Sequence, residues 1–322
     1  MASLLSVENL QVQFQTKKGI NTAVDGVSFS VEKGRILGIV GESGCGKSVT
    51  SMSILQLLGS NARIFGGSIK LDGKELIGLP EKEMCRIRGN DIAMIFQDPM
   101  TALNPTLTIG TQLMEPIMLH QNCGKKEAWT RAVDVLKRVG IAAPEKRMKE
   151  YPHQLSGGMR QRVMIAMAVS CEPRLLIADE PTTALDVTIQ AQILELMCEL
   201  REKMGTAIML ITHDMGVVAE TADDVLVLYA GKAVEYGSIE DIFERPKHPY
   251  TQGLLNSIPR LDEDVELLNT IEGTVPAPDA MPAGCRFAPR CPYGKDRCMK
   301  EKPGVYHAGN SLVSCFRYEG EK

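Results

Sequence analysis

The chain has 322 residues, of which 44% are hydrophobic and 24% charged, a balance typical of a globular protein long enough for more than one domain. The formal net charge of −4 argues against a basic surface that binds nucleic acid. The sequence shows neither the pattern of a signal peptide nor a run of about 18 apolar residues, so we expect no secretory signal and no membrane span.

Short apolar runs alternate with helical patterns along most of the chain. We expect buried strands at residues 35–41, 91–97, 174–180, 206–214 and 224–231. We expect helices at residues 47–58, 126–140 and 188–205. Buried strands separated by helices predict a mostly parallel sheet that is covered by helices on both faces.

Two stretches depart from this alternation. Residues 99 to about 170 are helical in pattern without a convincing strand, which predicts a helical insert in the α/β core. After about residue 247, prolines and glycines accumulate and regular periodicity fades, so we place a domain boundary near residue 245.

The sequence "GESGCGKS" at residues 41–48 fits the pattern G-x-x-x-x-G-K-[ST], between an expected strand and an expected helix. Its glycines let backbone N–H groups surround phosphates, Lys47 can reach the terminal phosphates, and Ser48 can ligate Mg²⁺. The helix N-terminus should also lower the pKa of the Cys45 thiol. The expected nucleotide contacts are Gly41, Ser43, Gly44, Cys45, Gly46, Lys47, Ser48 and Val49.

Two further motifs fit phosphate chemistry. The apolar run "LLIADE" ends in Asp179, placed to support Mg²⁺, and Glu180, placed to orient or deprotonate an attacking water. In "LSGGM", Ser156 can cap the helix that follows, and Gly157 and Gly158 leave its first amides accessible. That helix start is either a second anion-binding terminus or an ordinary capped helix.

In chain order the sequence shows "GESGCGKS", "FQDP", "LSGGM", "LLIADEP", "TALD" and "LITHD". Over residues 4–236 this series resembles the ATP-binding subunits of ABC transporters, with Met159 where the family more often has Gln. The resemblance implies ATP and Mg²⁺ as cofactors. It implies an α/β P-loop NTPase fold: a RecA-like core, an antiparallel β subdomain and an inserted helical subdomain at about 99–170. The nucleotide-binding domain would span residues 1–245, and a small loop-rich cysteine domain residues 246–322.

The resemblance also assigns roles by position. Phe14 would stack on adenine, unless it is a buried strand residue. Gln97 would touch Mg²⁺ and the attacking water, and His213 would lie near the γ-phosphate. Asp186 would contact the opposite subunit.

Partners follow from the same resemblance. The chain would form a homodimer, or a heterodimer with a second ATPase, in which the "LSGG" helix of one subunit closes on ATP held by the other. Two integral-membrane permease subunits would dock at residues from about 98 to 121, and an external substrate-binding protein would act indirectly. The chain would lie peripherally at the cytoplasmic face of the membrane.

Four cysteines near the end have the spacing C-x5-C-x6-C-x16-C: Cys285, Cys291, Cys298 and Cys315. A [4Fe–4S] cluster accepts four thiolates from a loop-rich segment. Zinc usually binds closer cysteine pairs, and disulfides are disfavoured in a reducing compartment. Zinc, and thiols that are unligated or joined in disulfides, nevertheless stay open as alternatives.

"RPKHPYTQGLL" at residues 245–255 leads into "CRFAPRCPY", and together they resemble the C-terminal extension of peptide-importer ATPases. That similarity favours the cluster and an importer of dipeptides or oligopeptides. Nickel importers share much of it. A soluble ABC ATPase of DNA repair or translation is the alternative from another class, although the chain has no long heptad run and only one cassette. A structural metal-binding module fits only the last quarter.

Overall fold

The computed structural model describes residues 3–17, 19–182, 186–258, 270–277 and 280–320. The chain divides into two compact units. Residues 32–35 and 78–211 form one, called here the helical unit. Residues 3–31, 36–77 and 212–320 lie in the other, called here the phosphate-loop unit.

The helical unit is built on three parallel strands in the order β8-β7-β6. Their bounds are β6 (Ile92–Ile95), β7 (Leu175–Asp179) and β8 (Ala207–Ile211). Every residue of β7 and β8 is buried, as expected for apolar strands covered on both faces. The register places Leu175 opposite Ile92 on one side and Ala207 on the other.

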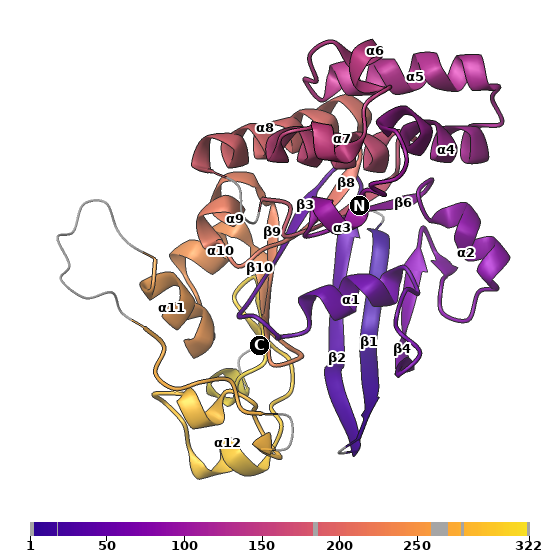
Figure 1. Cartoon of the computed structure of the whole chain (residues 1–322). Helices are drawn as coiled ribbons and strands as arrows, with labels where there is room; N and C mark the ends of the chain where they lie inside the picture. The colour runs from indigo at the N-terminus through magenta and orange to yellow at the C-terminus, as the bar shows by residue number, and fades with distance from the viewer. Residues whose placement is uncertain (1–2, 18, 183–185, 259–269, 278–279, 321–322) are drawn as a thin grey trace. The chain divides into compact units, whose positions relative to one another are not determined.

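Helices make up the rest of the helical unit, and several of them lie together in Figure 1. Their bounds are α2 (Glu81–Ile87), α3 (Pro99–Ala102), α4 (Ile109–Gln121), α5 (Lys125–Arg138), α6 (Pro144–Arg147), η1 (Pro152–Gln154), α7 (Gly157–Val169) and α8 (Val187–Met204). Residues 99–170, all of which are described, contain helices and no strand, so the predicted helical insert is confirmed. Helix α5 buries Ala128, Ala132 and Leu136, a spacing of four that gives it one apolar face.

The phosphate-loop unit contains an antiparallel sheet in the order β2-β1-β4-β5. Its strands are β1 (Ser3–Thr16), β2 (Gly19–Glu32), β4 (Ala62–Leu71) and β5 (Lys74–Glu75). Buried and more exposed residues alternate along the middle of β1, where Leu10 and Val12 are fully buried, as expected for a sheet with one face on the core.

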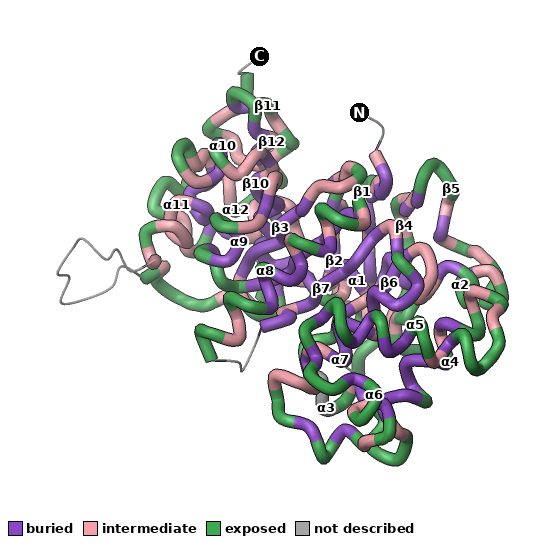
Figure 2. Tube along the Cα trace, turned by 90° about the horizontal axis from the view of Figure 1, so that it is seen from above, coloured by how far each residue is buried: buried purple, intermediate pink, exposed green. Residues whose placement is uncertain are grey.

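A second group of strands in this unit runs in the order β11-β12-β10-β9-β3. They are β3 (Ile36–Val40), β9 (Asp224–Tyr229), β10 (Lys232–Ser238), β11 (Tyr306–Ala308) and β12 (Ser311–Val313). Strands β3 and β9 are parallel, whereas β10 is antiparallel to β9 and β12. The end of the chain therefore adds two strands to the group that carries the phosphate loop. Figure 2 shows β3 as a buried strand.

Short helices complete the phosphate-loop unit: α1 (Lys47–Ile54), α9 (Met215–Thr221), α10 (Ile239–Glu244), α11 (Pro249–Asn256), η3 (Ala288–Arg290), α12 (Asp296–Lys300) and η4 (Phe316–Tyr318). All five predicted strands and all three predicted helices are confirmed, most of them a few residues shorter than expected. The separate cysteine domain after residue 245 stays a prediction. No helix within the described ranges has the length and apolar character that crossing a membrane requires.

Candidate functional site

The predicted phosphate loop follows β3 and opens α1 in the phosphate-loop unit. Gly41, Gly44 and Gly46 have φ angles of 152°, 77° and 102°, in the region that favours glycine. A Cβ atom at Gly41 would lie 2.1 Å from the carbonyl oxygen of Leu228. Only glycine fits this first position, so the sequence pattern has a steric cause.

The Lys47 side chain lies along the loop. Its Nζ donates hydrogen bonds to the carbonyl oxygens of Gly41 at 2.7 Å and Glu42 at 3.2 Å. The residue is 5% exposed. The loop thus holds a buried ammonium group beside its own backbone. This group can exchange its backbone partners for an anionic phosphate. Ser48, at the start of α1, is exposed, and its hydroxyl suits Mg²⁺ as an oxygen ligand.

The Cys45 prediction is wrong in one respect. The residue is 1% exposed, and burial raises the pKa of its thiol, an effect that outweighs the opposing charge of Lys47. The helix terminus was visible in the sequence, whereas the burial of the side chain was not.

Two predicted catalytic residues meet in the helical unit. Gln97 follows β6, and its Nε2 donates a hydrogen bond of 2.9 Å to Oε2 of Glu180. Glu180 follows β7 with a φ of 48°, and its backbone N–H donates to the carbonyl of Ile211 at 2.8 Å. This bond stabilises Glu180 in a backbone conformation that is unfavourable for any residue except glycine. The contact orients the carboxylate that we expect to act on water.

Three other predicted residues have clear local positions. Asp179 is the last residue of β7 and is 5% exposed. His213 follows β8 and is exposed. Phe14 lies near the end of β1, where it pairs with Ala62 and is half-buried. Both suggested roles for Phe14, adenine stacking and strand packing, stay predictions.

Helix α7 begins as predicted. Ser156 is its N-cap, and the Ser156 Oγ accepts a hydrogen bond from the Met159 N–H at 3.3 Å. Gly157 is exposed with nothing within 4 Å of its hypothetical Cβ. Asp186 in turn caps α8, since its Oδ1 accepts from the Ile189 N–H at 2.9 Å. Residues 183–185 of the "TALD" motif lie outside the described residues.

The four C-terminal cysteines converge on one small cavity. Cys285, Cys291, Cys298 and Cys315 all line a space of about 70 Å³, together with Phe287, Phe316 and Arg317. All nine cysteines of the chain are free thiols. Burial raises the pKa of Cys285 to about 11 and also raises the pKa of Cys291 and Cys315. Four thiols share one partly apolar space.

This convergence does not amount to a single-ion site. Among the described residues, no three His, Cys, Asp or Glu side chains are grouped closely enough to hold one metal ion. The iron–sulfur cluster and zinc therefore both stay predictions.

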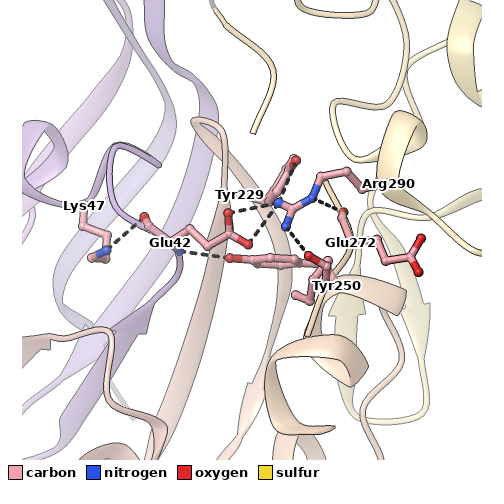
Figure 3. Close-up of polar contacts among 7 residues, drawn as sticks. Glu42, Lys47, Tyr229, Tyr250, Glu272 and Arg290 are labelled. Atoms are coloured by element: carbon pink, nitrogen blue, oxygen red, sulfur yellow. Dashed lines mark hydrogen bonds and ion pairs between the residues drawn. The ribbon is translucent and has the colours of Figure 1, made fainter. Parts of the chain in front are cut away.

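Sequence reasoning missed a contact between the phosphate loop and the C-terminal part of the chain. Glu42 is hydrogen-bonded both to Tyr250, through its backbone N–H, and to Arg290, through its carboxylate, as Figure 3 shows. Glu42 stands at a variable position of the loop motif, and Arg290 is 248 residues further along the chain. No spacing in the sequence could have paired them.

Comparisons with known proteins agree with the geometry. A family model described as "ABC transporter" matches residues 24–183, and one described as "Oligopeptide/dipeptide transporter, C-terminal region" matches residues 234–298. The chain is 56% identical to the oligopeptide transport ATP-binding protein AppD of Bacillus subtilis (strain 168), covering 100% of this chain and 98% of AppD. It is 52% identical to the oligopeptide transport ATP-binding protein OppD of Escherichia coli (strain K12), covering 98% of this chain and 93% of OppD.

A comparison with solved structures supports the same family. The dimeric structure of the ATP-binding cassette MJ0796 in a post-hydrolysis state with ADP and phosphate matches with a TM-score of 0.66 and 27% identity. The match covers 73% of this chain and 98% of that one. It confirms the predicted α/β P-loop NTPase fold with its helical subdomain.

Proposed function

Because the chain belongs to the ABC transporter family, we propose that it is the ATP-hydrolysing subunit of an importer for dipeptides or oligopeptides. One observation carries this proposal. The same chain joins a cassette match at residues 24–183 to a peptide-transporter C-terminal match at residues 234–298. The relatives' peptide-transport names favour this function over nickel import and over an ATPase of DNA repair or translation.

The chain is an ATPase, and its residues suggest how it performs hydrolysis. The loop amides and Lys47 bind the phosphates of ATP. Ser48 and Asp179 supply a hydroxyl and a carboxylate, oxygen donors that suit Mg²⁺, with Gln97 as a further oxygen donor. When bound, Mg²⁺ neutralises developing charge on the phosphates. Glu180, oriented by Gln97, accepts a proton from the attacking water, and His213 lies near the γ-phosphate.

Assembly is the second part of the proposal. Ser156, Gly157 and Gly158 at the start of α7 cover ATP held by another ATPase subunit, with Asp186 at the same interface. Two ATP molecules then join two subunits, and hydrolysis releases them. The dimeric structure of the MJ0796 cassette supports this arrangement. Two permease subunits receive the motion at the cytoplasmic face of the membrane, near residues 98–121.

Transport can be tested in cells that carry Glu180→Gln in place of the natural residue. We expect uptake of labelled dipeptides and tetrapeptides to be lost while nickel uptake is unchanged. Loss of nickel uptake with normal peptide uptake would contradict the peptide proposal. Affinity purification from detergent-solubilised membranes should recover two subunits with several membrane spans; recovery of a monomer bound to nucleic acid would contradict it too.

We also propose that Cys285, Cys291, Cys298 and Cys315 hold a [4Fe–4S] cluster. All four line one cavity, and Arg317 in its wall offsets negative charge on thiolates. The cluster, when bound, joins four points of a loop-rich segment.

Metal analysis after anaerobic purification tests the cluster. We expect about four iron atoms and matching acid-labile sulfide per chain, and loss of both in Cys291→Ser. The variant Cys85→Ser, which changes an exposed cysteine elsewhere, should keep its iron. Stoichiometric zinc without iron would contradict the proposal.

A further inference from the structure

The segment Cys285–Cys291 contacts the surroundings of the phosphate loop at two places. The first contact is made by Arg290, at the end of η3. Its Nη1 donates to both carboxylate oxygens of Glu42 at 3.0 Å. Its Nε and Nη2 donate to the carbonyls of Glu272 at 3.0 Å and Ile271 at 3.2 Å. The Arg290 side chain is 6% exposed, so this guanidinium is fixed on both sides (Figure 3).

Tyr250 of α11 holds the backbone of the same loop residue. Its hydroxyl accepts a hydrogen bond from the Glu42 N–H at 3.0 Å. The ring is fully buried against Tyr229 and Phe287, with centroid distances of 4.7 and 5.4 Å. Glu42 is therefore anchored by its side chain and by its backbone, through two residues that lie beyond the cassette match.

Arg286 makes the second contact. It donates to the carbonyl of Ala230 and to the carboxylate of Asp25, the latter at 3.2 Å. The next residue, Gly231, donates its N–H to the carbonyl of Cys45 at 2.8 Å. The same C-terminal segment thus supports the loop at its start and near its middle.

The loop needs such support because its glycines alone do not fix it. Gly44 has nothing within 4 Å of its hypothetical Cβ, and positive φ angles are open to every glycine of the motif. Amides that are aligned before binding spare the nucleotide the cost of ordering them. We propose that Arg290 and Tyr250 are positioning residues that hold the phosphate loop, through Glu42, in the conformation that binds nucleotide phosphates. The inference rests on the proposed function, since it takes ATP as the ligand.

Nucleotide affinity in a set of variants tests the proposal. The set is Arg290→Met, Glu42→Gln, the double variant and Tyr250→Phe, with a fluorescent ATP analogue as the probe and ATP turnover as a second measurement. We expect each single change to raise the Kd for the analogue and the KM for ATP about tenfold, with kcat within about twofold. The double variant of Arg290 and Glu42 should raise the Kd no further than either single change, because both single changes remove the same Arg290–Glu42 contact.

Arg297→Met is the matched control. Arg297 lies in the same C-terminal region and pairs with Glu301 and Glu319, and among the described residues none of its contacts involves the loop. It should leave Kd and KM unchanged. A merely structural role would lower kcat through loss of folded protein while KM stays constant. A lower kcat with a constant KM would overturn the inference. So would an unchanged Kd in Arg290→Met and Glu42→Gln, or a Kd that rises equally in Arg297→Met. Failure of the wild-type protein to bind the analogue would instead overturn the proposed function.

Discussion

At the scale of single residues, the contact between Gln97 and Glu180 is the most informative feature of the helical unit. The Gln97 amide donates to the Glu180 carboxylate, which fixes the orientation of the carboxylate without neutralising its charge. The carboxylate can then accept a proton from water while its other oxygen is held. In the proposed mechanism, Gln97 therefore orients the carboxylate and Glu180 accepts the proton.

We expect Glu180→Gln to lower ATP turnover by at least about 100-fold, because an amide cannot accept the proton. Nucleotide affinity should stay within about twofold, since the loop residues are untouched. Steady-state turnover and equilibrium binding check this, with Glu172→Gln as the control at an exposed acid of the same unit. Turnover at the wild-type rate would remove Glu180 from the catalytic role.

The buried Cys45 leads to a second expectation. A raised thiol pKa leaves less thiolate at neutral pH than an ordinary cysteine has, and its reactivity should increase only at higher pH. In the nucleotide-free protein, mass spectrometry should show Cys45 alkylated at least about tenfold more slowly than the exposed Cys85 at pH 7.5. Equal rates for the two cysteines would show that the loop opens readily to solvent.

At the scale of elements, α7 combines a structural cap with a proposed role toward nucleotide. Ser156→Ala should cost about 1 kcal/mol of stability through loss of the cap. Ser238→Ala is a matched control, because Ser238 caps α10 by accepting from the Asp241 N–H at 3.1 Å.

Both substitutions should lower the melting temperature by similar amounts. Only Ser156→Ala should also reduce ATP turnover, because only α7 is proposed to cover ATP on another subunit. Similar turnover in the two variants would leave α7 with the structural role alone.

Helix α11 depends on a neutral histidine. The Nδ1 of His248 accepts from the Tyr250 N–H at 3.1 Å, and burial lowers the pKa of His248 to about 3. The unfolded chain therefore binds a proton below about pH 6.5 that the folded chain does not. Stability should fall as pH drops from 6.5 to 5.5, by about 1.4 kcal/mol per pH unit at most. Burial raises the pKa of nearby Glu235. This shift makes stability rise as pH falls, the opposite of the histidine effect, and it acts at pH values nearer the ordinary pKa of a glutamate.

Melting temperatures at pH 7.5, 6.5 and 5.5 check this effect. His248→Asn should flatten the dependence while lowering stability at neutral pH, and His307→Asn, at an exposed site on β11, should not. A slope that is unchanged in His248→Asn would rule out the histidine as its source.

The elements themselves were largely predictable from the sequence. Strands β3, β7 and β8 are short apolar runs, because burial on both faces leaves no place for polar residues. Ser156 was predictable as a cap because Ser favours that position. The environment of Cys45 was not, since residues far away in the chain lie against it, such as Gly231, whose N–H donates to the Cys45 carbonyl.

At the scale of the whole molecule, contacts between residues far apart in the sequence were the hardest feature to predict. The four cysteines could be grouped by spacing, and they do share a cavity. That Arg290, next to one of them, holds Glu42 of the phosphate loop could not be deduced, because neither residue's motif specifies a partner. The C-terminal region is thus linked by hydrogen bonds to the phosphate loop.

The central claim is that ATP is enclosed between the phosphate loop of one subunit and α7 of another. The most direct measurement is light scattering of the purified chain during ATP turnover, across a range of protein concentrations. We expect turnover per chain to rise with concentration as dimers form, and Glu180→Gln with MgATP to accumulate the dimer. Full turnover by a chain that remains monomeric at every concentration would contradict the account.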